Sequence, residues 1–338
     1  MTRPAILFRA DASHVIGLGH VARTCALFEE VDPSLAEPIA LFGGDDAAST
    51  WARGQRLAAP IKPWTTDDVL AIAAERQVRA VVVDGPALAD ALLPRLAEAR
   101  IKAILIDDRG HCVLPVDTVV NHNVHAPALA ASYATARQRL LGREYLLLRR
   151  AIRRFTRGSC RPRDAARLRV VVSFGGSDPV GATARIVRLV PAKRPLDLVV
   201  ITGPGYRDQT ALCAAAKAAA LAGHNVEVRH NPDDPAELFV TADAAVCSAG
   251  GTLGELAYLG CPALGVAIVP DQVMAARSQA RSGMIAGGRV LAETDDDALR
   301  AELTAFVLGD RRRREQRERA LDSADGLGAR RVVELALG

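Results

Sequence analysis

Aromatic and lysine side chains are scarce in this sequence. Phenylalanine, tryptophan and tyrosine make up 4% of the 338 residues. Arginine supplies nearly all of the positive charge, because the lysines are only Lys62, Lys102, Lys193 and Lys217. With a net charge of +4 we expect no nucleic-acid partner, which would need a strong positive field or aromatic side chains for base stacking. The arginine-rich stretches 149–169 and 311–319 are expected to form a surface connection between domains and a solvated helix face.

The sequence also lacks the features of secreted and membrane proteins. Its six cysteines include no C-x-x-C pair, which is typical of reduced, mostly buried thiols in a cytoplasmic protein. No apolar run approaches the roughly 20 residues that a membrane-spanning helix needs. Arg9 and Asp11 stand where a signal peptide would have its apolar stretch. We therefore expect a cytoplasmic protein with no membrane insertion.

Short apolar runs alternate with alanine-rich stretches over the whole chain. This alternation predicts an α/β fold with parallel sheets, and the length of 338 residues predicts two domains of similar size. Each half contains five expected strands. They are residues 5–10, 37–42, 79–84, 102–107 and 117–121 in the first half, and 168–174, 196–202, 225–230, 243–248 and 262–268 in the second.

Small and polar residues follow the expected strands, which is where open parallel sheets bind their ligands. In the first half these are the loop containing His20, Asp84, the pair 107–108 and residues 121–123. In the second half they are the glycine-containing loops 175–179, 202–206 and 248–252. We expect each set to meet at one edge of its sheet, and the two edges to face each other across a cleft.

The loop SAGGT, residues 248–252, has the pattern of a phosphate site. Gly250 and Gly251 let the backbone approach a ligand, and a helix begins directly after them, so free N–H groups and the positive helix end favour an anion. Glu255, one turn into this helix, is suited to accept hydrogen bonds from ribose hydroxyl groups. GGSDP at 175–179 predicts a second group of amides. Two such loops in one domain favour a diphosphate over turns that need glycine only for their backbone angles.

The loop IGLGH, residues 16–20, has two competing interpretations. Residues 17–22 match the dinucleotide fingerprint G-x-G-x-x-A, but in that fold the first glycine follows its strand almost immediately. Gly17 lies well beyond the first expected strand, and no acidic residue stands at the usual offset. We therefore favour the interpretation in which the glycines let His20 approach a ligand. A helix N-terminus disfavours the charged imidazole, so a neutral His20 opposite a phosphate site is suited to be a general base.

Several segments, in order and at suitable spacing, resemble a known enzyme family. They are FRADASHVIGLGHVARTCAL with Arg23 after the glycine loop, LIDD with VVNHN, GREYLLLR, SFGGSDP and SAGGTLGELAYLGCPAL. The family is the PseG and SpsG group of UDP-2,4-diacetamido-2,4,6-trideoxy-β-L-altropyranose hydrolases of pseudaminic acid biosynthesis. It belongs to the GT-B superfamily and is related to the MurG glycosyltransferases. The resemblance covers nearly the whole chain.

The resemblance implies a GT-B fold with two Rossmann-like domains, whose parallel sheets face each other across a cleft that holds a UDP-sugar. Residues 1–150 would carry the His20 loop, residues 168–320 would bind the nucleotide, and a C-terminal helix at 321–338 would pack back toward the first domain. His20 would activate water for attack at the anomeric carbon, breaking the C–O bond with inversion and releasing UDP. The implied enzyme is a hydrolase with no metal and no cofactor, and we expect a monomer.

The resemblance also implies roles for individual residues. Asp11 joins His20 as a catalytic residue, and Asp11 and Asp84 would line the sugar side. The residues expected to hold the diphosphate and the ribose are Ser248, Gly250, Gly251, Thr252 and Glu255. The other expected substrate-binding residues are Gly17, Gly19, Arg23, Asn121, Tyr145, Arg149, Gly175, Gly176, Ser177, Asp271 and Gln272.

Two positions depart from the family pattern. The family has His-Tyr after the aspartate that corresponds to Asp84, whereas this chain has Gly85 and Pro86. It has Asn-Gln where this chain has Asp271 and Gln272. Both positions would contact the sugar, so we expect a UDP-sugar other than the pseudaminic acid precursor to be preferred.

Two alternative functions remain. A GT-B glycosyltransferase would use the same His20 to deprotonate an acceptor hydroxyl, and a nucleotide-sugar-binding protein would perform no chemistry. The presence of His20 and Asp11 argues against the binding protein. The exposed apolar and basic patch that membrane-associated transferases carry on their first domain is not evident in the sequence.

Overall fold

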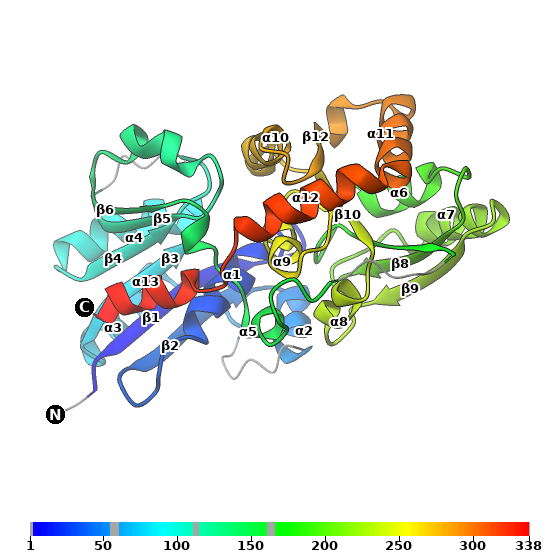
Figure 1. Cartoon of the computed structure of the whole chain (residues 1–338). Helices are drawn as coiled ribbons and strands as arrows, with labels where there is room; N and C mark the ends of the chain where they lie inside the picture. Colours follow the sequence, from blue (N-terminus) through cyan, green and yellow to red (C-terminus); the bar gives the residue numbers. More distant parts are fainter. Residues whose placement is uncertain (1–2, 55–60, 111–114, 161–165, 338) are drawn as a thin grey trace. The chain divides into compact units, whose positions relative to one another are not determined.

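The computed structural model describes residues 3–54, 61–110, 115–160 and 166–337. The chain divides into two compact units. The first comprises Met1–Arg150 together with Gly326–Gly338, and the second comprises Ala151–Asp325. In the part of the chain described, each unit is built around one six-stranded sheet in which all neighbouring strands are parallel (Figure 1).

The sheet of the first unit has the strand order β2-β1-β3-β4-β5-β6. Its strands are β1 (Ala5–Ala12), β2 (Glu37–Gly44), β3 (Val78–Asp84), β4 (Lys102–Ile106), β5 (Val116–Asn121) and β6 (Ala136–Leu141). Its helices are α1 (Gly19–Phe28), α2 (Asp46–Gly54), α3 (Thr66–Glu75), α4 (Pro86–Glu98) and α13 (Gly328–Leu337), with short 3-10 helices η1 (Ala126–Tyr133) and η2 (Arg143–Tyr145). β2 pairs with one side of β1, and β3 with the other, so the strand order reverses between β1 and β3.

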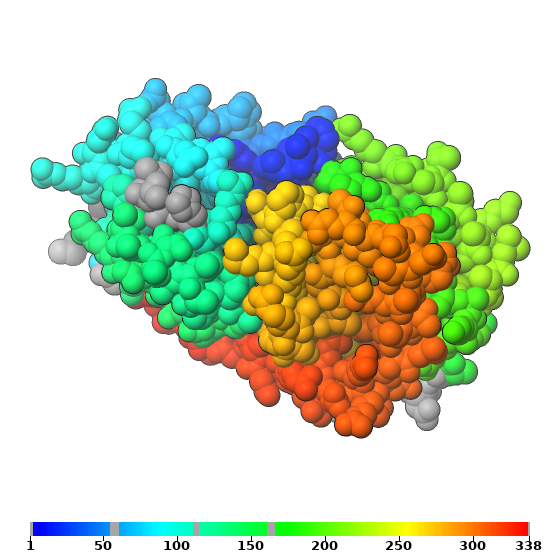
Figure 2. Space-filling view, turned by 90° about the horizontal axis from the view of Figure 1, so that it is seen from above, coloured from blue at the N-terminus to red at the C-terminus, as the bar shows by residue number. Residues whose placement is uncertain are grey.

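The sheet of the second unit has the order β12-β11-β10-β7-β8-β9, which is the strand order of the doubly wound nucleotide-binding fold. Its strands are β7 (Leu168–Ser173), β8 (Leu196–Thr202), β9 (Asn225–His230), β10 (Ala244–Ser248), β11 (Ala263–Ala267) and β12 (Ala286–Val290). Its helices are α6 (Ala182–Leu189), α7 (Gln209–Leu221), α8 (Pro235–Val240), α9 (Gly251–Leu259), α10 (Val273–Arg281), α11 (Asp296–Leu308) and α12 (Asp310–Asp322). The short helices η3 (Pro270–Gln272) and η4 (Leu291–Glu293) also lie here, and α5 (Arg150–Arg153) stands at the boundary between the units. Figure 2 shows α10 to α11 (yellow to orange) as a continuous surface of this unit.

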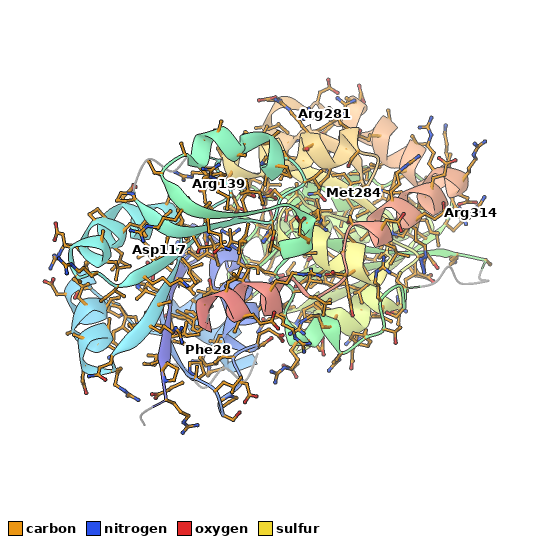
Figure 3. All side chains as sticks on the ribbon, turned by 60° about the vertical axis from the view of Figure 1, so that its left-hand side comes forward. Phe28, Asp117, Arg139, Arg281, Met284 and Arg314 are labelled. Atoms are coloured by element: carbon orange, nitrogen blue, oxygen red, sulfur yellow. The ribbon has the colours of Figure 1, made fainter. Side chains whose placement is uncertain are left out.

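All ten strands predicted from the sequence are confirmed, with ends that differ by two residues at most. Two further strands, β6 and β12, had no apolar run to reveal them. The three middle residues of β6 are exposed, among them Arg139 (Figure 3), and β12 contains Gly287 and Gly288 with positive φ. Both are edge strands, so their side chains have less surface to bury than those of central strands.

Both faces of the first sheet are buried. Alternate residues of β1 enter two separate cores, with Phe8 packing among residues of α1 and α13, and Leu7 among residues of α3 and α4. Burial on both faces explains why β1, β3 and β4 appear in the sequence as nearly unbroken apolar runs. A third core fills the second unit.

The chain returns to the first unit at its C-terminal end. Ala329, Val332 and Val333 of α13 are buried in the same core as Val21 of α1. The preceding helix, α12, carries the arginine-rich run 311–319, of which most side chains are exposed, Arg314 among them (Figure 3). Arg313 and Gln316 are exceptions, because both are buried and donate to backbone carbonyl groups.

The cysteines of the described residues are free thiols. Cys25, Cys160, Cys247 and Cys261 are buried and Cys213 is exposed, which confirms the expectation of reduced, mostly buried thiols for these five. Cys112 lies outside the described residues. Within the described ranges, none of the helices is both long enough and apolar enough to cross a membrane.

Gly328 at the start of α13 is a sensitive position of the first unit. A Cβ atom there would lie 2.4 Å from the backbone carbon of Tyr145 and 2.5 Å from the nitrogen of Leu146. We expect Gly328→Ala to lower the free energy of unfolding by about 1–3 kcal/mol, because backbone must move to admit the methyl group. Thermal unfolding measures this. The matched control is Gly54→Ala, whose Cβ would meet open space. Equal midpoints for the two variants would contradict the packing of α13 against η2.

Candidate functional site

The loop after β1 lies at the point where strand order reverses in the first sheet. In open α/β sheets, ligands bind beyond the carboxyl ends of the strands at this position. β1 ends at Ala12, α1 begins at Gly19, and the adjacent strand β3 ends at Asp84. The sequence separation between β1 and Gly17 confirms that the tight turn of the dinucleotide fingerprint is absent.

Hydrogen bonds within the loop and to α2 hold it in place. Ser13 and Gly17 exchange backbone hydrogen bonds, and Gly17 has a φ of +81°, a conformation that favours glycine. The backbone N–H of His14 donates to Asp45 Oδ2 at 2.8 Å, and its ring Nδ1 lies 2.6 Å from the same oxygen. The loop therefore leads into α1 in a defined conformation, with His20 as the second residue of the helix.

Asp84, at the end of β3, is the centre of a buried polar cluster. Its side chain has no exposed surface. Arg23, one turn along α1 from His20, donates to both of its oxygens, with Nε 2.6 Å from Oδ2 and Nη2 2.7 Å from Oδ1. Thr24 Oγ1 donates to Oδ2 at 3.1 Å, and His20 Nδ1 lies 2.7 Å from Oδ1. The carboxylate thus fixes three side chains of α1.

These contacts determine the tautomer of His20. An ionised carboxylate only accepts hydrogen bonds, and a guanidinium only donates them. Nδ1 of His20 lies 2.7 Å from the Asp84 oxygen and 3.1 Å from Arg23 Nη2, so the closer carboxylate receives the Nδ1 proton. Nε2 then carries the lone pair of the ring. The side chain of His20 is 24% exposed, which leaves the ring accessible from solvent.

The charges of the cluster stabilise one another. Burial opposes the charged form of Arg23, but the carboxylates of Asp108 and Asp84 outweigh it and raise the pKa of Arg23. Burial also opposes the charged form of Asp84, whereas Arg23 and His20 lower the pKa of that carboxyl below its usual range. The pKa of Asp108 is lowered in the same way, chiefly by Arg23. Both aspartates are therefore ionised at neutral pH.

The cluster extends along the sheet edge to the ends of β5 and β6. Asn123 Nδ2 donates to Asp108 Oδ1 at 2.9 Å, and the Arg23 guanidinium pairs with Asp108 Oδ2. His122 is buried, and burial lowers its pKa to about 4 although Asp108 acts in the opposite direction. Arg143 is close enough to contribute to this shift.

The structure brings together only some of the residues expected in the first unit. His20, Arg23 and Asp84 share the cluster, but Asp84 is fully buried and holds side chains of the protein instead of lining the sugar side. Among the described residues no hydrogen bond links Asp11 to His20, and the Asp11 carboxylate pairs with Arg9. Asp84 was expected to line the sugar side; in the structure both of its oxygens bind side chains of α1.

Three more residues of the first unit were expected to bind substrate, namely Asn121, Tyr145 and Arg149. Asn121 is fully buried, donates to Tyr133 Oη at 2.8 Å and accepts from the backbone and side chain of Asn123. Tyr145 packs against the core that contains α13. Arg149 lies close enough to Cys25 for its charge to lower the pKa of that thiol, which burial raises. Cys25 lies further along α1 than His20. Gly19 begins α1, and a Cβ atom there would meet nothing within 4 Å.

The change from His-Tyr to Gly85 and Pro86 has a backbone consequence. Gly85 has a φ of +127°, which side-chain-bearing residues rarely adopt, and Pro86 begins α4. A histidine placed after Asp84 would be strained in this conformation. The departure from the family pattern therefore changes the loop as well as its side chains.

In the second unit, the loop 248–252 also lies where strand order reverses, at the end of β10 next to β7. Gly250 is the N-cap of α9 and provides no side-chain hydrogen bond, so the first N–H groups of this helix have no side-chain cap. Ser248 is buried, Gly251 is exposed, and Thr252 and Glu255 are partly exposed on the first turns of α9. This geometry suits an anion at the helix N-terminus.

Gln272, which follows Asp271 in η3, approaches the same loop. A Cβ atom on Gly250 would lie 3.4 Å from Gln272 Nε2 and 3.9 Å from Ser248 Oγ. The side-chain oxygen of Gln272, Oε1, accepts a hydrogen bond from the backbone N–H of Ile268 at 3.0 Å. Ser248, Gly250 and Gln272 are thus neighbours.

The loop GGSDP does not offer a second open helix terminus. The buried Asp178 accepts hydrogen bonds from the N–H groups of Ala182 at 2.9 Å and Thr183 at 2.7 Å, and so caps α6. Gly176 is in close backbone contact with residues 203–205, where a Cβ on Gly203 would lie 2.4 Å from the Gly176 Cα. Tight packing against Gly176 thus accounts for Gly203, and a φ of +83° accounts for Gly175. Gly175 and Ser177 flank this contact without adding an uncapped helix end.

Sequence reasoning placed Asp108 and His122 after expected strands but gave them no role, and it did not single out Arg143. Arg143 follows β6, which was not predicted, and its place beside His122 depends on the pairing of β6 with β5. The described residues contain no group of three or more histidine, cysteine, aspartate or glutamate side chains arranged to hold a metal ion.

Comparisons with known proteins place this chain in a structural class. No model of a protein family matches the sequence. An uncharacterized protein of Methanocaldococcus jannaschii is 24% identical over 258 residues, which cover 75% of this chain and 53% of that protein, so the chain spans about half the length of this curated relative.

Solved structures match almost the whole chain. MurG of Acinetobacter baumannii has a TM-score of 0.68 at 17% identity, with 98% of each chain covered. MnaA of S. aureus, solved with UDP, has a TM-score of 0.67 at 12% identity and covers 98% of this chain and 95% of its own. UDP-GlcNAc 2-epimerase of Neisseria meningitidis, bound to UDP-GlcNAc, has a TM-score of 0.65 at 10% identity, with 98% and 99% covered. At these identities the likeness shows the fold, which is GT-B, as the resemblance implied.

His122 makes the stability of the first unit depend on pH. Its pKa is about 4 in the folded protein, against an ordinary value of 6.5, because burial and the charges of Arg23 and Arg143 outweigh Asp108 and Asp84. Between these values the unfolded chain binds more protons, so the free energy of unfolding falls as the pH is lowered from about 6.5 to 4. The shift corresponds to about 3 kcal/mol.

Denaturant unfolding of wild type and His122→Gln at several pH values checks this. The difference between the two proteins isolates His122 from carboxyl groups, whose lowered pKa values act at more acidic pH. We expect the stability of His122→Gln to depend less on pH between 7 and 5 than that of wild type. Parallel curves would mean that His122 is not buried in its neutral form.

Proposed function

We propose that this protein is a hydrolase that releases UDP from a UDP-sugar, with His20 as the general base. The observation that carries the proposal is the Nδ1 contact of His20 with the buried Asp84 carboxylate, at 2.7 Å. This pairing orients a histidine and stabilises the imidazolium that forms when it takes a proton, as in hydrolases with an aspartate–histidine pair. The resemblance to the PseG and SpsG hydrolases supports the same assignment.

The reaction follows from the state of His20. Nε2 accepts a proton from water while the water oxygen forms a bond to the anomeric carbon. The bond from that carbon to the β-phosphate oxygen breaks, and its electron pair leaves with UDP. Attack opposite the leaving group inverts the configuration. Asp84, already ionised, stays a carboxylate and balances the positive charge that His20 gains.

The nucleotide is assigned to the second unit. The uncapped N-terminus of α9, with Gly250, Gly251 and Thr252, would bind the diphosphate through backbone N–H groups and the helix dipole. Ser248 and Gln272 would line the same site, and Glu255 would accept hydrogen bonds from the ribose. Amides and a helix end can stabilise the departing diphosphate, so the mechanism requires no metal ion.

A glycosyltransferase is the second candidate, and the structural comparisons favour it. MurG is among the similar structures, as is the spinosyn rhamnosyltransferase SpnG, with a TM-score of 0.57 at 14% identity. In a transferase, His20 would remove the proton of an acceptor hydroxyl instead of water. Incubation with a panel of UDP-sugars, followed by chromatography for UDP, separates the two. UDP release without acceptor supports the hydrolase, and release only with an acceptor supports the transferase.

Loss of the base should abolish turnover and leave nucleotide binding intact. We expect His20→Ala to lower kcat by about 10²- to 10⁴-fold, the usual contribution of a general base. UDP affinity, measured by calorimetry, should change little, because the base acts on water. His230→Ala, which removes an exposed histidine of β9, is the matched control. A kcat near that of wild type in His20→Ala would refute the mechanism.

The ribose assignment can be checked separately. We expect Glu255→Ala to weaken UDP binding by about 1–3 kcal/mol, the range for hydrogen bonds to a charged group. Glu237→Ala, which removes an exposed carboxylate from α8, serves as control. Unchanged UDP affinity in Glu255→Ala, measured by calorimetry, would remove this residue from the nucleotide site.

A further inference from the structure

Two basic side chains at the edge of the first sheet have no part in the mechanism above. They are His122, after β5, and Arg143, after β6. Nε and Nη2 of Arg143 and Nδ1 of His122 are buried and have no hydrogen-bond partner among the described residues. A buried donor left unpaired is costly, and a charged one more so. A ligand that pairs with these atoms would remove this cost.

The two unpaired nitrogens of Arg143 are positioned to bind two oxygens of one anion. In Arg23 the same two nitrogens, Nε and Nη2, bind the two oxygens of the Asp84 carboxylate at 2.6 and 2.7 Å. In Arg143 this edge of the guanidinium is vacant. Its geometry matches two oxygens of one carboxylate or phosphate. Burial lowers the pKa of Arg143 only to about 10, so the group remains a cation at neutral pH.

Strand pairing places Arg143 beside His122 and near the His20 cluster. Asn121 of β5 is opposite Leu141 of β6, and the N–H of Gly142 donates to the Asn121 carbonyl at 2.9 Å. In this register His122 is level with Gly142, so Arg143 follows one residue further along, close enough for its charge to act on His122. The charges of Arg143, Arg23, Asp108 and Asp84 all act on His122. The vacant guanidinium edge and His20 thus belong to one edge of one sheet.

We infer that Arg143, assisted by His122, binds a two-oxygen anion of the sugar nucleotide and so determines substrate specificity. The anion is either a carboxylate on the sugar, as in a uronate, or a phosphate of the nucleotide. A neutral His122 adds a hydrogen bond without a further charge. The inference rests on the proposed function only for the kind of ligand, because the vacant donors are a property of this chain.

Binding measurements test this without turnover, so a failure of the proposed hydrolysis would not affect the outcome. Calorimetry with UDP-glucuronate, UDP-glucose and UDP compares wild type with Arg143→Met and Arg143→Lys. Arg137→Met removes an exposed arginine from the same strand and is the matched control. Arg143→Lys keeps the charge but cannot present two parallel N–H groups.

If the anion is a sugar carboxylate, wild type should bind UDP-glucuronate more tightly than UDP-glucose. Both Arg143 variants should then weaken UDP-glucuronate binding by about 10- to 100-fold and leave UDP-glucose unchanged. If the anion is a phosphate, the variants should weaken all three ligands alike. In either case the thermal midpoint should not fall, because among the described residues no hydrogen bond involves Nε or Nη2 of Arg143.

Two results would overturn the inference. One is that neither variant changes the affinity for any of the three ligands, or that wild type binds none of them. The other is that Arg143→Met lowers the thermal midpoint while Arg143→Lys restores both midpoint and affinity. In that case the charge of Arg143 would stabilise the fold, and its Nε and Nη2 atoms would bind no ligand.

Discussion

The buried ion pair between Arg23 and Asp84 is the interaction on which the candidate site depends. It joins α1 to the end of β3 through two hydrogen bonds of 2.6 and 2.7 Å. A carboxylate without exposed surface requires such pairing, because a lone buried charge would cost several kcal/mol. Arg23 donates one hydrogen bond to each oxygen of Asp84. Oδ1 can still accept a second hydrogen bond, and it accepts one from His20 Nδ1. The ion pair therefore sets the position and tautomer of the proposed base.

The same constraint explains why one edge of the first sheet holds so many polar residues. Parallel strands end together, and their last residues must be solvated, bound to each other or bound to a ligand. Asp84, Asp108 and Arg23 satisfy one another, and Asn121 is satisfied by Tyr133 and Asn123. Within the described ranges, Nε and Nη2 of Arg143 are buried without a hydrogen-bond partner. Arg143 therefore differs from Arg23, whose same two nitrogens bind Asp84.

The two units use their sheet edges differently. In the first, the candidate site consists of side chains, and glycine is needed at Gly17 and Gly85 for backbone conformation. In the second, the uncapped start of α9 offers backbone groups, whereas Asp178 already fills the start of α6. Two loops of similar composition thus differ in their capacity to bind an anion, because the carboxylate of Asp178 in one of them already binds the N–H groups that an anion would bind.

Apolar runs and glycine-rich turns are local signals, so the α/β class, ten of the strands and the loops at their carboxyl ends could be predicted from the sequence. It also indicated His20 at a helix N-terminus. It could not reveal β6 and β12, whose exposed or glycine residues leave little apolar pattern. The roles of Asp84 and Asn121 were decided only by the tertiary structure, since burial and partners depend on distant segments. Arg143 became a candidate for the same reason: only the pairing of β6 with β5 brings it beside His122.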